Sequence, residues 1–317
     1  MSFPVFDLHC DTALALCGAE SGKSVKLYAN DLHVDLQRAS KLPGFAQCFA
    51  CFTTPFMLEW QKTSPELVFQ QELEAIMTQL EENKSIIRQA FTAEDVRRNR
   101  EDGMMSGILT IEGPAGFGFD SEKLAELYKL GFRITTLGWN EQNILAGSHR
   151  TGGGLTEKGR DYMKEAQRLG FIIDVSHLSD EGFWDMMELT EKPIIASHSN
   201  SRAVWGESRN LTDDMFKAIC QTGGVAGLNL YSGFIGKEPT LDTACDHVLH
   251  FLELDPEGKH ISLGGDLDGC EALPEGFTGV ESYPALANRL LSRGVTEEIL
   301  HNIYWNNALG VMERCCM

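Results

Sequence analysis

Eight short apolar segments recur along the 317-residue chain, and each is ended by polar or turn-forming residues. Between them, apolar residues recur every three or four positions, which is the spacing of an amphipathic helix. A chain in which strand and helix patterns alternate in this way is predicted to form an α/β fold with a parallel sheet. The apolar segments are 4–8 (PVFDL), 45–52 (FAQCFACF), 107–111 (GILTI), 132–136 (FRITT), 171–175 (FIIDV), 193–197 (PIIAS), 224–229 (GVAGLN) and 260–264 (HISLG).

Eight alternations favour a closed (β/α)8 TIM-like barrel of the metal-dependent hydrolase type, predicted here as a single catalytic domain over residues 1–317. The alternative is a doubly wound open sheet, but the first strand is not followed by the glycine-rich phosphate motif of that fold. We expect an extra helix at 93–102 and a final helix at 296–307 that closes the end. The other predicted helices are 66–88, 121–130, 156–169, 180–188, 212–221 and 241–254.

The charge balance excludes several kinds of partner. Lys and Arg total 27 against 46 for Asp and Glu, a net charge of −19. Such an acidic surface repels nucleic acid and anionic membranes. The chain has no apolar run long enough to span a membrane, and its N-terminus lacks the pattern of a secretory signal. We therefore expect a cytoplasmic protein without nucleic-acid or membrane partners.

The nine cysteines show no regular spacing, which argues against a disulfide framework in a chain of this length. We expect them to be reduced. Cys48 and Cys51 form a CxxC pair within an apolar run, but positions i and i+3 of a strand face opposite sides. Buried packing is therefore predicted for this pair, and not a metal or redox site.

Polar residues of a particular kind follow five of the eight apolar segments. In a barrel of parallel strands, the residues that follow the strands meet at one rim, where such enzymes have their active sites. Positions two apart on a strand also point to the same side, so the first two of these side chains should lie together. The residues are His9, Asp11, Glu112, His177, His198 and Asp266.

Three histidines and three carboxylates form a suitable ligand set for two divalent metal ions, with zinc as the first expectation. Two neighbouring ions need a bridging carboxylate, and Glu112 is the natural candidate. Two dications and three carboxylates leave a charge of about +1, which a bridging hydroxide would neutralise. Metal ions make such a hydroxide available near neutral pH because they lower the pKa of bound water to about 7.

Each of these residues also has a purely structural explanation when taken alone. Asp11 could cap the helix that follows it, and residues 265–269 (GDLDG) could form only a turn. A histidine after a strand is often an ordinary core or loop residue. The metal-site hypothesis depends on the joint occurrence of ligand-type residues at five strand ends.

Several linked motifs resemble the renal (membrane) dipeptidase family, a branch of the amidohydrolase-like metal-dependent barrels. The similarity extends over nearly the whole chain and in the same order. The matching motifs are His9-Cys-Asp11, Ile111-Glu112-Gly113, 154–159 (GLTEKG), Asp174-Val-Ser-His177, Ala196-Ser-His198-Ser, Arg209-Asn210 and 264–269 (GGDLDG).

The resemblance implies a binuclear zinc peptidase that cleaves dipeptides, including dipeptides with a D-residue at the second position. Transferred by position, His9 and Asp11 bind one zinc ion, His177 and His198 bind the other, and Glu112 bridges the two. The family resemblance also suggests a homodimer.

The same resemblance implies roles for residues outside the ligand set. Asp266 would take a proton from the bridging water and pass it to the leaving amine. Arg209 would hold a substrate carboxylate or the developing oxyanion. Tyr231 matches a substrate-pocket tyrosine.

One segment departs from the family pattern. The family commonly has a histidine after the fourth strand, in a Leu-Thr-His segment that contacts the substrate, where this chain has Trp139 followed by Asn140. Tryptophan offers one N–H donor but cannot act as an acid or base. We expect Trp139 or Asn140 to orient the substrate instead, or Trp139 simply to line the site. The alternatives to a dipeptidase are hydrolysis of a lactam, lactone or N-acyl amino acid, and a non-catalytic binding barrel.

Overall fold

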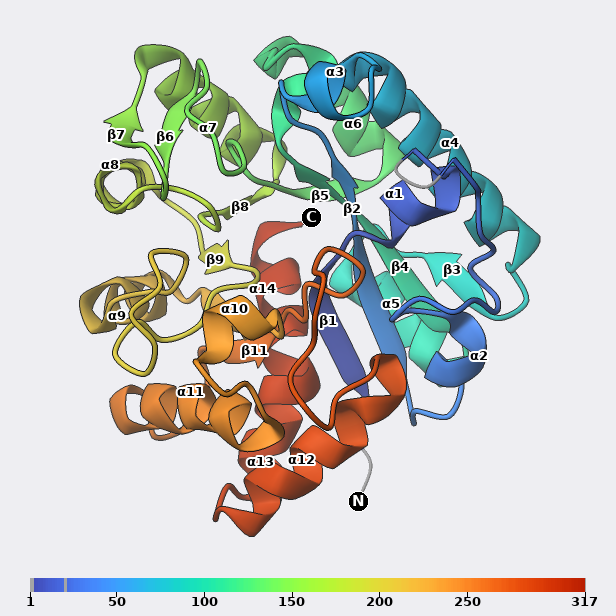
Figure 1. Cartoon of the computed structure of the whole chain (residues 1–317), viewed down its shortest axis with the longest axis vertical. Helices are drawn as coiled ribbons and strands as arrows, with labels where there is room; N and C mark the ends of the chain where they lie inside the picture. The colour runs from blue at the N-terminus through green and yellow to red at the C-terminus, as the bar shows by residue number, and fades with distance from the viewer. Residues whose placement is uncertain (1–2, 20–21, 317) are drawn as a thin grey trace.

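In the computed structural model, which describes residues 3–19 and 22–316, eight parallel strands form a closed barrel surrounded by helices (Figure 1). Residues 1–2, which belong to the N-terminal segment predicted to lack a secretory signal, lie outside the described residues. All eight predicted strands are confirmed, with ends shifted by at most two residues. They are β1 (Val5–Cys10), β2 (Phe45–Phe52), β4 (Met105–Glu112), β5 (Phe132–Thr135), β8 (Ile172–Asp174), β9 (Ile194–Ala196), β10 (Val225–Leu228) and β11 (Ile261–Leu263).

Pairing between β2 and β4 closes the ring. The neighbours run in the order β2, β1, β11, β10, β9, β8, β5 and β4, and Ala46 to Phe52 of β2 then pair in parallel with Ser106 to Glu112 of β4. This continuous closure excludes the doubly wound open sheet. Two additional short strands, β6 (Ala146–Ser148) and β7 (Gly152–Leu155), form an antiparallel hairpin outside the barrel.

Helices cover the outside of the barrel, and several begin at a side-chain cap. Ser64, Thr156 and Thr212 each accept a hydrogen bond from a backbone N–H of the first turn, which satisfies a donor that the helix leaves unpaired. The helices are α1 (Thr12–Cys17), α2 (Leu36–Ala39), α3 (Met57–Trp60), α4 (Pro65–Glu82), α5 (Ala93–Glu101), α6 (Leu124–Leu130), α7 (Glu157–Leu169), α8 (Asp180–Leu189), α9 (Asp213–Thr222), α10 (Ser232–Ile235), α11 (Leu241–Leu254), α12 (Tyr283–Ser292), α13 (Glu297–His301) and α14 (Asn307–Cys315).

The prediction of one helix over 66–88 was wrong at its end. Helix α4 stops at Glu82, and residues Ile87–Gln89 form a short strand, β3, beside β4. The apolar residues Ile86 and Ile87 continue the spacing of the helix by coincidence, whereas Asn83 caps it and the chain then turns. The short helices α2, α3 and α10, helix α12 and the β6–β7 hairpin had not been predicted.

The C-terminal helix closes the barrel from below, but with residues beyond the predicted range 296–307. A π-helical turn, Asn302–Asn306, interrupts it, and α14 continues to Cys315. Trp305, Leu309 and Met312 pack against the inward-facing side chains of the strands, among them Phe6 and Ile108. Figure 1 shows α14 across the middle of the ring of strands. This end of the barrel is therefore filled, and the opposite rim remains for a site.

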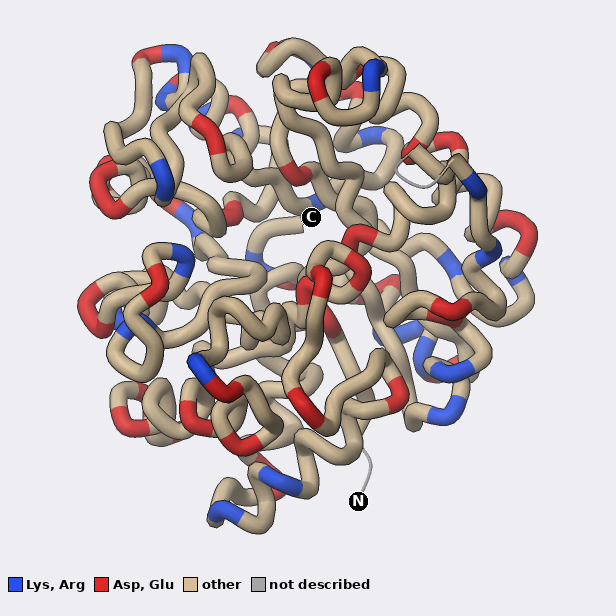
Figure 2. The backbone as a smooth tube through the Cα atoms, in the orientation of Figure 1, with Lys and Arg blue, Asp and Glu red and all other residues tan. Residues whose placement is uncertain are grey.

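Cys48 and Cys51 confirm the expectation of buried packing. Cys48 belongs to the cluster inside the barrel, and Cys51 belongs to the core between strands and helices. All nine cysteines lie within the described residues, and none of them forms a disulfide there. None of the helices described is both long and apolar enough to cross a lipid bilayer. Acidic residues are spread around the periphery, with basic residues between them (Figure 2).

Candidate active site

The six ligand-type residues that follow the strands come together at the open rim of the barrel, and all six side chains are buried. His9 lies at the end of β1 and Asp11 directly after it, and Glu112 ends β4. His177, His198 and Asp266 lie in the loops that follow β8, β9 and β11. Parallel strands bring positions 9 to 266 together because their carboxyl ends share one rim.

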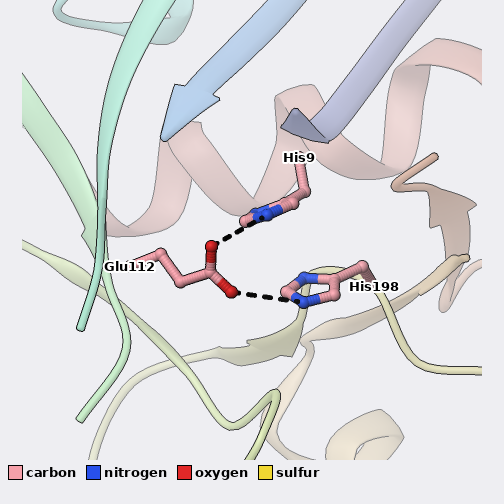
Figure 3. Close-up of side chains that lie close together, drawn as sticks. All are labelled: His9, Glu112 and His198. Atoms are coloured by element: carbon pink, nitrogen blue, oxygen red, sulfur yellow. Dashed lines mark ion pairs between the residues drawn. The ribbon is translucent and has the colours of Figure 1, made fainter. Parts of the chain in front are cut away.

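Glu112 lies in the middle of the cluster, with each carboxylate oxygen facing a different histidine (Figure 3). Its Oε2 atom is 3.4 Å from His9 Nε2. Its Oε1 atom is 2.9 Å from His177 Nε2 and 3.8 Å from His198 Nε2. A carboxylate with this arrangement can bind two cations at once, one with each oxygen.

A second group of ligand atoms surrounds His9 on its other side. His9 Nε2 lies 3.3 Å from Asp11 Oδ2 and 3.9 Å from Asp266 Oδ1. Two sets of side chains, His9–Glu112–His198 and His9–Asp11–Asp266, each place their ligand atoms within 4.8 Å of one another. The rim therefore contains two overlapping groups of the kind that hold metal ions.

Two site residues have an unusual backbone conformation. His177 has a φ angle of 73° and Asp266 one of 56°, both in the left-handed region. A residue with a Cβ atom adopts this conformation at a cost of about 1–2 kcal/mol. Such conformations persist where surrounding contacts enforce them, and they are frequent at functional sites.

Hydrogen bonds to the Nδ1 atoms of His177 and His198 determine which nitrogen of each ring carries the proton. His177 Nδ1 lies 2.8 Å from Asn140 Oδ1, and a carbonyl oxygen can only accept, so Nδ1 donates. His198 Nδ1 lies 2.6 Å from Ser197 Oγ, which itself hydrogen-bonds the buried Asp174. With the Ser197 proton directed to Asp174, His198 Nδ1 also donates. The Nε2 atoms of His177 and His198 are then both lone-pair acceptors.

These two acceptors face each other at 2.9 Å, an arrangement that a positive ion between them would stabilise. Two further buried atoms, His9 Nε2 and Asp11 Oδ1, have no hydrogen-bond partner among the described residues. Buried polar atoms without a partner are costly and call for an explanation such as an ion. The residues present therefore fit divalent metal ions, and His/Asp/Glu donors suit zinc.

The electrostatics of the cluster agree with this fit. Burial and the Asp11 carboxylate raise the pKa of Glu112 to about 8. Burial lowers the pKa of His177, with Arg209 adding to the effect, and burial and His9 lower that of His198. For His9, burial lowers the pKa but the Glu112 and Asp11 carboxylates outweigh it, so the pKa lies well above its usual value. Closely packed carboxylates beside the neutral imidazoles of His177 and His198 favour a bound cation.

Arg209 adds a buried positive charge next to the histidines. Its Nη2 atom is 3.1 Å from His177 Nε2, and its Nη1 donates to Ser199 Oγ at 3.1 Å. Among the described residues, its Nε–H has no hydrogen-bond partner. A buried guanidinium with a free donor is suited to bind an anionic group of a ligand.

Trp139 and Asn140 both lie beside His177, although in different ways. The Trp139 ring centre is 6.1 Å from that of His177, and its other neighbours are Phe52 and the half-exposed Trp60. These rings form an aromatic wall at the edge of the cluster. Asn140 instead directs its side-chain oxygen at His177.

Tyr231 lies farther out. Its ring packs edge-on against Phe234, which in turn lies under the Arg209 guanidinium at 5.4 Å. Among the described contacts, Tyr231 has no hydrogen bond to the six clustered residues. Its ring is connected to the cluster through Phe234 and Arg209, and its backbone N–H donates to Asn229 Oδ1 at 2.6 Å.

Sequence reasoning missed two side chains that touch the cluster. Asn229 Nδ2 donates to Asp266 Oδ2 at 3.0 Å, and His149 Nε2 lies 2.8 Å from Asn140 Oδ1. Burial and the nearby Arg209 lower the pKa of His149 to about 3. Asn229 is the last residue of a predicted strand segment and could have been included on that ground. His149 lies in a glycine-rich stretch without any pattern that points to it.

Fold and site together define a (β/α)8-barrel hydrolase with a candidate metal centre. Residues 1–315 match the family model of the membrane dipeptidases, peptidase family M19. The chain belongs to this family of peptidases.

Relatives agree with this placement. An uncharacterized dipeptidase from Schizosaccharomyces pombe is 35% identical over 214 residues, which are 65% of this chain and 52% of that protein. A metallopeptidase from Rhodobacter sphaeroides, solved with a phosphinate mimic of the dipeptide L-Ala-D-Ala, has a TM-score of 0.87 and 26% identity, covering 99% of this chain and 100% of the other. A dipeptidase of family M19, named dipeptidase AC, has a TM-score of 0.86 and 27% identity, covering 100% of this chain and 99% of the other.

Proposed function

We propose that this protein hydrolyses dipeptides at a centre that holds two divalent ions, with zinc as the native metal. The observation that carries the proposal is Glu112, whose two oxygens face separate histidines at 3.4 and 2.9 Å. His9 and Asp11 would hold one ion, and His177 and His198 the other. When bound, the two ions supply a water of lowered pKa and polarise the carbonyl of the scissile bond.

Asp266 acts as the proton carrier in this proposal. Hydrolysis adds the water oxygen to the carbonyl carbon, breaks the C–N bond and requires a proton on the leaving nitrogen. The Asp266 carboxylate takes the proton of the attacking water and delivers it to that nitrogen. The amide of Asn229 fixes its Oδ2 atom at 3.0 Å and leaves Oδ1 facing the cluster.

Arg209 binds the free carboxylate of the dipeptide. The Nε–H without a partner and the planar guanidinium suit a carboxylate. A dipeptide zwitterion has no net charge, so a protein of net charge −19 does not repel it at long range. Trp139 lines the site as part of the aromatic wall, and Asn140 acts through His177.

The proposed function is tested by a substrate panel. Dipeptides of the L,L and L,D series, an N-acyl amino acid, a lactam and a lactone are assayed after zinc loading, after removal of metal by a chelator, and after zinc is added back. We expect the dipeptides to be cleaved, with L,D-dipeptides accepted, and about two ions per chain in the active protein. The chelator should abolish cleavage and zinc should restore it, because the ions supply the reactive water.

Other outcomes of the panel would overturn parts of the proposal. Turnover of the N-acyl amino acid, lactam or lactone without turnover of dipeptides would favour another amidohydrolase-like activity. Cleavage of dipeptides that survives complete metal removal would contradict the metal mechanism. Metal binding without turnover of any compound would favour a non-catalytic binding barrel.

Replacing Arg209 by alanine is expected to lower kcat/KM for dipeptides about 10- to 100-fold, the value of a hydrogen bond to a charged group. The corresponding dipeptide amides, which lack the carboxylate, should lose much less. The matched control is Arg150→Ala, which removes an exposed positive charge from the nearby hairpin. Equal losses for dipeptides and their amides would contradict the carboxylate contact.

A further inference from the structure

The β6–β7 hairpin lies against the loop that carries His177. The backbone N–H of His149, between the two strands, donates to the His177 carbonyl at 2.9 Å. Ser148 forms an antiparallel bridge with Leu178, and the Ser179 hydroxyl donates to the Gly153 carbonyl at 2.5 Å. These bonds hold the chain on both sides of His177, whose left-handed backbone needs such support. The hairpin therefore fixes the backbone position of this candidate ligand.

The hairpin also reaches the His177 side chain, through Asn140. Asn140 Oδ1 lies 2.8 Å from His177 Nδ1 and 2.8 Å from His149 Nε2, so both rings donate to the same oxygen. The Ser148 hydroxyl donates to the Asn140 backbone carbonyl at 2.9 Å. On the far side of the His149 ring, Nδ1 lies 2.8 Å from Ser208 Oγ. The Nε2–H form of the neutral ring requires the Ser208 hydroxyl to donate to this Nδ1 atom and not to its other acceptor, Glu207 Oε1, at 3.0 Å. Asn140 is thus held by its backbone and by its side chain.

We propose that His149 is a positioning residue that locks the Asn140 amide, and through it the tautomer and orientation of His177. A side-chain amide can rotate by half a turn and exchange its oxygen for an NH2 group. With NH2 toward His177, Nδ1 would accept and the proton would move to Nε2, which then could not bind a metal. The N–H at His149 Nε2 opposes that rotation, because after it this donor would face the Asn140 NH2 group and would lose its acceptor. The inference rests on the proposed function, in which His177 is a metal ligand.

The test uses three full-length variants and two readouts. His149→Phe keeps a ring of similar size but removes the donor, whereas His149→Gln restores an N–H donor near the position of Nε2. All keep the backbone N–H to His177. The control is His250→Gln on α11, a histidine that pairs with Asp213 outside the cluster. The first readout is zinc binding by competition with a chelator, and the second is the tautomer of His177, measured by 15N NMR on histidine-labelled protein without zinc.

We expect wild-type protein to bind about two zinc ions and His149→Phe to bind one of them about 10- to 100-fold more weakly, the usual effect of losing a hydrogen-bonding partner of a ligand. His149→Gln should recover most of the affinity, and the control should match wild type. In the NMR experiment, the Nδ1–H tautomer of His177 should dominate in wild type and in His149→Gln but not in His149→Phe.

Contrary outcomes separate this inference from the proposed function. If His149→Phe keeps both zinc affinities and the wild-type tautomer, the inference is wrong. If His149→Phe and His149→Gln lose affinity equally, ring packing and not the hydrogen bond is responsible, which also overturns it. If wild type binds no zinc, the proposed function fails, and the NMR readout still decides whether His149 controls the His177 tautomer.

Discussion

Glu112→Gln is expected to leave no more than one metal ion bound and to lower turnover of dipeptides at least about 1,000-fold. Two metal ions contribute several kcal/mol to lowering the reaction barrier, and each 1.36 kcal/mol of barrier is a factor of ten in rate. The physical reason is the position of the two oxygens, which face His177 and His9 at 2.9 and 3.4 Å. Glutamine keeps only one of these oxygens, and it removes one of the negative charges that offset the two cations. Metal analysis and steady-state kinetics on the same samples measure both effects.

A buried glutamate outside the cluster provides the control for this substitution. Glu141 is also buried, and burial raises its pKa to about 7. Glu141→Gln should retain the wild-type metal content. If Glu112→Gln binds two ions and turns over normally, Glu112 does not bridge the metals, and the two-ion proposal loses its main support.

Asp266→Asn is expected to lower kcat about 100- to 10,000-fold, the range that a general acid–base group contributes. The metal content should stay the same, because the five proposed ligands remain. The amide has the shape of the carboxylate but cannot take a proton from water and pass it on. Turnover, metal content and thermal stability are measured together, with the exposed Asp180→Asn on α8 as the control.

The metal content of Asp266→Asn distinguishes two roles for this residue. Asp266 Oδ1 lies 3.9 Å from His9 Nε2, and with Asp11 and His9 it forms one of the groups that could hold an ion. Loss of an ion from Asp266→Asn would assign Asp266 as a ligand and contradict the proton-carrier role. Full turnover would show that another group carries the proton.

The fold could be predicted from the sequence because its signals are local. Each strand of the barrel appears as a short apolar run, and the predicted segment 45–52 coincides with β2. Where the pattern was ambiguous, the prediction failed. Ile86 and Ile87 continue the helical spacing of α4, yet β3 begins at Ile87 because an unpaired edge of β4 is available there. Pairing partners in the tertiary structure, and not local spacing, decided this segment.

For the candidate site, the sequence predicted the clustered residues but not the side chains around them. Its six ligand-type residues follow strands, and the rule that parallel strands share one rim brought His9 and Asp266 together before any distance was known. The residues around the ligands were not predictable. The hairpin from 146 to 155 has four glycines and no apolar alternation, so nothing indicated that His149 would reach Asn140.

The sequence by itself determined the eightfold strand–helix alternation, the residues that end the strands and hence the kind of chemistry at the rim. These features depend on the periodicity of side chains along the chain, which is a property of the sequence. Only the tertiary structure decided which oxygen of Glu112 faces which histidine, which ring nitrogens are acceptors, and that His149 fixes Asn140. Those features depend on hydrogen bonds between different strand ends and loops, such as the Ser197–Asp174 and His149–Ser208 pairs. Such bonds form only when the closed barrel places these segments side by side.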